Sequence, residues 1–130
     1  MSEVRDVSLS EQLDPSTPAY INARLMELEQ RFQESPTMLR EARERLAQAT
    51  ENYLTAKAHA FLTADGPNKE AREAQAHIAT ADARERVRVA EAAFKYLQDR
   101  VHELSKELNA LQTRSSNMRS EINIAGKGRP

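Results

Sequence analysis

The sequence predicts an all-α fold: a long, coiled-coil-like antiparallel helical hairpin with a short N-terminal helix or kinked extension, assembled into an oligomer. Ala, Glu, Arg, Leu and Gln dominate the 130 residues, a composition typical of long helices. Apolar residues recur in alternating steps of three and four, and one strong turn, Asp65-Gly66-Pro67-Asn68, divides this pattern. Helical stripes become buried against a facing helix, so two stripes joined by a short turn favour a hairpin.

Composition and charge limit the class of protein. The chain is 39% hydrophobic and 30% charged, which favours a thin helical assembly over a thick globular core. The absence of cysteine excludes disulfides and thiol chemistry. Charges interrupt every apolar run, so neither a membrane span nor a signal peptide is expected, and we expect a cytoplasmic protein. The net charge of -1 conceals an acidic start and a basic end, either an ordinary solvated surface or an attraction between subunits or partners.

The N-terminal region is expected to hold a leader and a first helix. Residues 1–17 lack periodicity and include Asp14-Pro15-Ser16-Thr17 before Pro18, so they are predicted to be a flexible acidic leader. A first helix is predicted over residues 18–34. Its apolar stripe consists of Ile21, Leu25, Leu28 and Phe32.

Two further helices complete the predicted hairpin domain of residues 18–123. Ser35-Pro36 supplies an N-cap and a proline at the first helical position, so a second helix starts there, over residues 36–63, or the first one kinks. A return helix is expected over residues 68–123, and residues 124–130 are expected to form a disordered basic tail.

The stripes of the two arms are complementary in size. They consist of Leu39, Ala42, Leu46, Ala49, Tyr53, Ala56 and Ala60 before the turn, and of Ala76, Thr80, Ala83, Val87, Ala90, Phe94, Leu97, Val101, Leu104, Leu108, Leu111, Ser115, Met118 and Ile122 after it. If Ala60 faces Ala76, large side chains meet small ones at most levels, as in Ala42 with Phe94. The alanines near the turn let both arms approach closely.

A second, weaker apolar stripe remains outside this seam. A lone two-helix hairpin cannot cover it, and such surface usually marks association, so we expect a homo-oligomer. The candidate interface residues are Leu54, Phe61, Ile78, Val89, Ala93 and Tyr96.

No enzyme signature is present in the sequence. Paired catalytic groups and a phosphate-cradling glycine loop are both missing, so we expect neither catalysis nor a cofactor. His59 and His77 fall opposite each other in the register above, but no third ligand accompanies them. Solvent-facing histidines are therefore expected there, and no metal site.

Basic residues gather in the half of the hairpin nearest the turn. Such groups bind phosphates, and the rings of Phe61 or Tyr96 can stack on unpaired bases, whereas no recognition helix for duplex DNA is evident. The basic positions are Lys57, His59, Lys69, Arg72, Arg84, Arg86 and Arg88. The candidate DNA-binding residues among them are Lys57, His59, Lys69, Arg72, Arg84 and Arg88.

The order of these features resembles phage recombination mediators of the UvsY type. The likeness covers about residues 36–123 and is mostly one of layout. The family has a basic motif before the turn, and the similar segment here is Ala56-Lys57-Ala58-His59-Ala60-Phe61-Leu62. Lys57 and His59 stand at the positions of the motif's two basic residues. Where the family has a permanent cation and two tyrosines, this chain has His59 and a single phenylalanine.

The resemblance implies an oligomeric, non-enzymatic protein of DNA recombination and replication. Such a protein binds single-stranded DNA and helps to load a recombinase by displacing single-strand-binding protein. A structural coiled-coil or scaffold protein that acts through helix–helix contacts without DNA is the alternative prediction.

Overall fold

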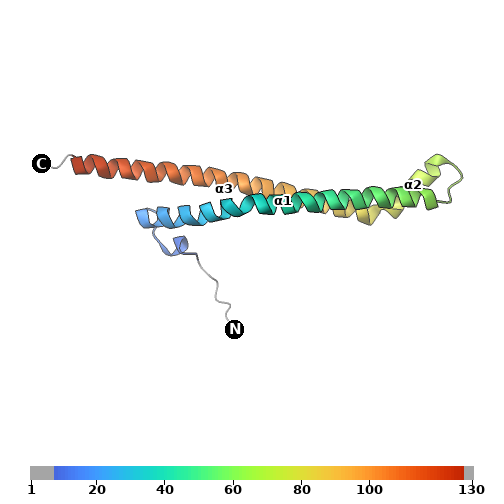
Figure 1. The fold of residues 1–130 in the computed structure, drawn as a ribbon, viewed down its shortest axis with the longest axis horizontal. Coiled ribbons are helices and arrows are strands. Elements are labelled where there is room, and N and C mark those ends of the chain that lie inside the picture. Colours follow the sequence, from blue (N-terminus) through green and yellow to red (C-terminus); the bar gives the residue numbers. More distant parts are fainter. Residues whose placement is uncertain (1–7, 128–130) are drawn as a thin grey trace, which may run out of the picture. The chain divides into compact units, whose positions relative to one another are not determined.

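A computed structural model describes residues 8–127 of the chain, and these residues form helices joined by short connections. The 3-10 helix η1 spans Ser10–Gln12, and the α-helices are α1 (Pro18–Thr63), α2 (Lys69–Ala79) and α3 (Ala81–Lys127). Helix α1 packs against α3, as an antiparallel hairpin requires (Figure 1). The prediction of an all-helical hairpin is thereby confirmed. The contacts divide the chain into two units, residues 1–35 with 101–130 and residues 36–100.

The first unit contains a buried apolar core. Ile21, Leu28 and Leu111 are buried at its centre, all three from the predicted stripes. Partly buried apolar side chains surround them: Tyr20, Leu25, Leu104, Leu108 and Met118. Phe32, which was placed in the same stripe, is instead 41% exposed.

Residues 8–17 are ordered by specific contacts, so the prediction of a flexible leader is wrong for this part; residues 1–7 lie outside the described residues. Asp14 accepts hydrogen bonds from the backbone N–H and hydroxyl of Ser16, at 2.9 and 2.8 Å, in a local turn. Thr17 then caps α1, because its hydroxyl oxygen accepts from the Tyr20 N–H at 3.3 Å. Pro18 follows at the first helical position, where no N–H is needed.

A polar network joins this segment to both long helices of its unit. Glu27 accepts from the Ser10 N–H at 3.1 Å and from its hydroxyl at 2.6 Å. Arg24 pairs with Glu27 and, at 3.0 Å, with Glu107 on α3. Arg114 donates to the carbonyl oxygen of Pro15 at 3.1 Å. These bonds explain why a segment without apolar periodicity is nevertheless held in place.

Of the two alternatives predicted at Ser35-Pro36, a new helix or a kink, the new helix is wrong, because α1 continues through Pro36. The proline removes one backbone hydrogen bond, a cost of roughly 3 kcal/mol in a helix interior. The stripes on either side of it are each packed within their own unit, as buried Leu28 and Ala42 show. Ser35 is buried, and its hydroxyl donates to the Arg31 carbonyl oxygen at 3.0 Å.

The predicted return helix is divided at Thr80. Its backbone has φ -104° and ψ 15°, and its hydroxyl donates to the Ala76 carbonyl oxygen at 2.7 Å. Arg84 donates to the carbonyl oxygen of His77 at 2.9 Å. The Ala76 carbonyl also accepts the Thr80 N–H at 3.1 Å, so side chains supplement the backbone hydrogen bonds at the end of α2, and α3 starts one residue later. At the far end α3 reaches Lys127, so residues 124–127 are helical where a disordered tail was predicted, and residues 128–130 lie outside the described residues.

The second unit is thin, as the alanine-rich seam requires. Ala42, Ala76 and Thr80 are its buried seam residues. The guanidinium of Arg43 lies 5.6 Å from the ring centroid of Phe94, one residue from the predicted facing pair of Ala42 and Phe94. Asn68 caps α2 by accepting from the Ala71 N–H at 2.8 Å.

Candidate nucleic-acid interface

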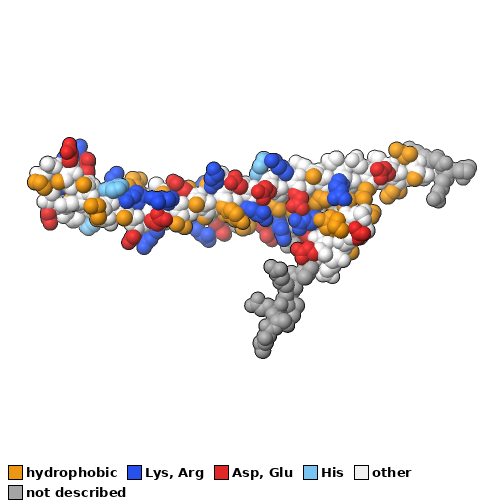
Figure 2. All heavy atoms as spheres, turned by 180° about the vertical axis from the view of Figure 1, so that it is seen from behind, with side chains coloured by type: hydrophobic (Ala, Val, Ile, Leu, Met, Phe, Trp, Pro, Cys, Tyr) orange, Lys and Arg blue, Asp and Glu red, His pale blue; other side chains and the backbone are white. Residues whose placement is uncertain are grey.

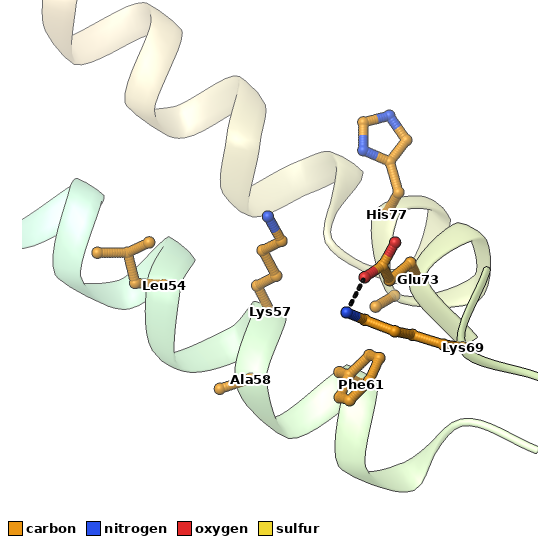
Figure 3. A pocket seen from close by; sticks show the side chains of 8 residues that line it. Leu54, Lys57, Ala58, Phe61, Lys69, Glu73 and His77 are labelled. Carbon is orange, nitrogen blue, oxygen red and sulfur yellow. Dashed lines mark ion pairs between the residues drawn. The ribbon is translucent and has the colours of Figure 1, made fainter. Parts of the chain in front are cut away.

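A groove open to solvent lies beside the turn of the second unit, between α1 and α2. We call it the turn groove. Its lining residues are Leu54, Lys57, Ala58, Phe61, Lys69, Glu73, Ala76 and His77. Those from α1 recur at steps of three and four, so one helix face supplies that wall, and α2 supplies the other (Figure 3).

The groove combines cations with an aromatic ring. Lys57 has no ion pair within residues 8–127, and its ammonium lies 6.0 Å from the ring centroid of Tyr53. Lys69 lies 3.9 Å from a carboxylate oxygen of Glu73. Both of these side chains are more than half exposed, so this pair contributes little to stability and can separate when a ligand binds.

Phe61 is partly covered by a further cation. The guanidinium of Arg72 lies 5.9 Å from its ring centroid, and Arg72 also donates to the Asn68 carbonyl oxygen at 3.4 Å. The ring projects from α1 beside Lys69 (Figure 3). A flat base has room to stack here only where Arg72 shifts or where the opposite face of the ring is free.

Of the two remaining arginines predicted to bind DNA, Arg84 adjoins the groove through His77. Its guanidinium, which can only donate, lies 3.0 Å from Nδ1 of His77, so that nitrogen is the acceptor. Arg88, one turn further along α3, forms an ion pair with Glu85 at 3.1 Å.

His59 is not part of the groove. Two residues of α-helix rotate the chain by about 200°, so Lys57 and His59 project from different sides of α1. Only Lys57 lines the groove, while His59 is exposed elsewhere. The sequence motif suggested one site for both residues because closeness along the chain does not show this rotation. Glu73, which the sequence reasoning missed, is recognisable from its spacing of four residues from Lys69.

A second groove follows the seam between α1 and α3 in the same unit. We call it the flank groove: two adjoining hollows that share Arg45 and Arg86. Its lining residues are Ala42, Arg45, Gln48, Ala49 and Asn52 of α1, and Ala83, Glu85, Arg86, Val89, Ala90, Ala93 and Leu97 of α3. Arg45 and Leu54 are nine residues apart, two and a half turns, so the two grooves open on opposite sides of α1.

Four of the six residues predicted for an oligomer interface are divided between these grooves, and the other two lie outside both. Leu54 and Phe61 line the turn groove, whereas Val89 and Ala93 line the flank groove. Ile78 and Tyr96 are 75% and 64% exposed. Figure 2 shows hydrophobic side chains between charged ones on one face of these helices. One contact between copies therefore cannot cover all six residues, and oligomerisation stays a prediction.

Other kinds of site find no support in the described part of the chain. No three His, Asp or Glu side chains among residues 8–127 are grouped so that they could hold a metal ion. Within the same residues, no helix has both the length and the apolar character needed to cross a membrane.

Electrostatic perturbation is found in the first unit, away from both grooves. The hydroxyl of Ser10 lowers the pKa of Glu27 below its ordinary value of 4.5, and the Ser10 N–H and Arg24 add to this effect. The hydrogen bond to Glu107 raises the pKa of Arg24. The two hydrogen bonds from Ser16 lower the pKa of exposed Asp14. These shifts belong to structural hydrogen bonds, and none involves a residue of the turn groove.

Comparison with protein-family models, with curated proteins and with solved structures found no match to this chain.

Proposed function

We propose that the protein is a non-enzymatic, cytoplasmic accessory factor of DNA recombination and replication that binds single-stranded DNA at the turn groove. The observation that carries the proposal is the groove's combination of unpaired Lys57 with Lys69 around Phe61. Cations that follow a phosphate chain, beside a ring that stacks on bases, are the usual components of single-strand binding. The resemblance to UvsY-type mediators extends the proposal to loading a recombinase in place of single-strand-binding protein, as a homo-oligomer.

Fluorescence anisotropy of a labelled oligothymidine of about 20 nucleotides tests this proposal, beside a duplex of equal length. We expect preferential single-strand binding that weakens with salt. Lys57→Ala removes one phosphate contact, so the slope of log K against log salt becomes shallower by about 0.7. His59→Ala is the matched control, because it removes a nearby polar side chain that lies outside the groove.

Two results would count against DNA binding at the turn groove. One is the absence of binding even at low salt, and the other is an equal loss for Lys57→Ala and His59→Ala. The first result leaves the hairpin without a DNA-binding role, and the second moves the contact away from the turn groove.

A structural or scaffold protein is the second candidate, favoured by the large apolar side chains exposed on the second unit. Leu54, Val89 and Tyr96 are 57%, 61% and 64% exposed, which helix–helix contacts would cover. Sedimentation velocity with and without the oligonucleotide separates the two functions. A scaffold self-associates and does not bind DNA, whereas a mediator binds DNA.

A further inference from the structure

The flank groove has a floor of small and aliphatic side chains. Ala49 and Ala83 line one of its hollows, and Val89, Ala93 and Leu97 line the other. Small residues let the backbone of a third helix approach closely, at the interaxial distance of 8–10 Å that packed helices prefer. Val89 is nevertheless 61% exposed, so the chain itself leaves this apolar surface open.

Two arginines stand along this floor, one from each helix. Arg45 of α1 and Arg86 of α3 line both hollows, and neither has an ion pair or a hydrogen bond within residues 8–127. The one carboxylate in the lining, that of Glu85, is engaged by Arg88 at 3.1 Å. The groove therefore presents two guanidinium groups that form no ion pair within residues 8–127, directly beside apolar surface.

We propose that the flank groove docks an amphipathic α-helix of a second protein, with an apolar ridge flanked by Asp or Glu side chains. Leucines spaced by three and four residues would pack on the apolar floor of the groove, while the Asp or Glu side chains beside them would form ion pairs with Arg45 and Arg86. From Ala83 to Leu97 the groove extends about 21 Å along α3, room for about four turns. The docked helix would complete a three-helix bundle around the seam.

Charge makes a second copy of the chain a poor occupant. If the same face docked on itself, the Arg45 and Arg86 side chains of both copies would lie in one interface. If the turn-groove face of another copy docked there, Lys57 and Lys69 would approach the same arginines. Either contact would bring like charges together, and like charges across an interface suppress association.

Nucleic acid is also a poor occupant, because no aromatic side chain lines the flank groove. Unpaired bases would meet alanine and valine, which offer no ring for stacking. The proposal is independent of DNA binding: because the two grooves open on opposite sides of α1, occupancy of one leaves the other accessible.

A synthetic helical peptide tests the inference on the full chain. The probe is a fluorescein-labelled peptide of about 18 residues with leucines at heptad positions and glutamates on both sides of them. One control peptide replaces the glutamates with lysines, and another scrambles the leucines so that no apolar face forms. We expect anisotropy to rise only with the acidic amphipathic peptide.

Variants locate the contact. Arg45→Glu with Arg86→Glu should weaken peptide binding at least tenfold, and so should Val89→Glu, whose exposed position tolerates the change. Lys57→Glu with Lys69→Glu, at two residues of the turn groove, is the matched charge control and should leave peptide binding unchanged. Far-UV circular dichroism verifies that each variant remains helical.

Four results would overturn the proposal. The acidic peptide fails to bind, or the lysine peptide binds as tightly. The Arg45 and Arg86 substitutions weaken oligothymidine binding while leaving peptide binding intact, which makes the groove a nucleic-acid surface. Val89→Glu dissociates a self-associated wild type that binds no peptide, which makes it an interface between copies.

Discussion

Substitution of Glu27 by Gln tests how the N-terminal segment is held on the first unit. The carboxylate accepts two hydrogen bonds from Ser10, at 3.1 and 2.6 Å, and a weaker one from Arg24 at 3.4 Å. Hydrogen bonds to a charged group contribute roughly 1.5–3 kcal/mol, and neutral ones about 0.5–1.5 kcal/mol. Glutamine keeps the size and loses the charge, so we expect Glu27→Gln to lower the free energy of unfolding by about 1–2 kcal/mol at pH 7.

The loss should depend on pH in a definite direction. The folded-state pKa of Glu27 lies below its ordinary value of 4.5, so its stabilisation is complete above that value. As the pH falls from 4.5 through the folded pKa, the wild-type carboxylate becomes protonated and its advantage over glutamine disappears. The wild type and the variant should therefore converge in stability in acid.

Urea unfolding followed by circular dichroism at pH 7 and at pH 3 measures both quantities. Glu29→Gln, an exposed neighbour on the same helix, is the matched control and should change stability little at either pH. Hydrogen exchange of the Ser10 amide, which donates to Glu27, reports local release of the segment. An equal loss at both pH values, or none at pH 7, would refute the assignment of this stabilisation to the charged carboxylate.

Two further substitutions test the packing of each unit. Gly66→Ala should destabilise the turn, because a Cβ at Gly66 would lie 2.8 Å from the Arg72 backbone nitrogen and 2.9 Å from the Ala71 carbonyl carbon. Thermal unfolding should show a lower Tm for this variant, and an unchanged Tm would contradict the close approach. Leu28→Ala should lower the free energy of unfolding, measured with urea, by about 2–5 kcal/mol because Leu28 is fully buried. Met26→Ala, at a 72% exposed side chain, should lower it little. Equal losses for the two variants would contradict the core assignment.

The seam of the hairpin was predictable because it depends on repetition. Each stripe residue adds to the same helical face, so errors at single positions such as Phe32 do not change the fold. Buried Ile21, Leu28 and Leu111 all came from this pattern. Pro36 and Thr80 were misjudged for the opposite reason: each is a single residue whose effect depends on the packing and side-chain bonds around it.

The N-terminal segment could not be predicted from periodicity, because polar contacts hold it. Ser10 is 2% exposed although it is polar, and its partner Glu27 is 17 residues away. No short sequence motif indicates a hydrogen bond between residues so far apart in the sequence. The sequence of residues 8–17 suggested only turns and charge, and these were interpreted as flexibility.

The candidate sites were only partly predictable. The sequence shows which residues lie in the same segment, but the rotation of about 100° per residue around the helix axis determines which side chains share a face. Lys57, Lys69 and Phe61 share a groove as expected, but His59 does not. The same angle separates Arg84, which contacts His77, from Arg86, two residues further along α3, which lines the flank groove. A helical-wheel projection of α1 and α3 would have revealed both separations.

The thinness of the second unit has a consequence for how a protein of this kind can act. A two-helix hairpin has one buried seam and two open flanks, and each flank is a ready position for a third element. Here the flanks differ in chemistry: one combines lysines with Phe61, and the other combines arginines with alanine and valine. Because different helix faces supply them, a substitution on one flank can abolish its contact without altering the other. Loss of oligothymidine binding by Lys57→Ala and loss of peptide binding by Arg45→Glu with Arg86→Glu should therefore be separable in the same protein.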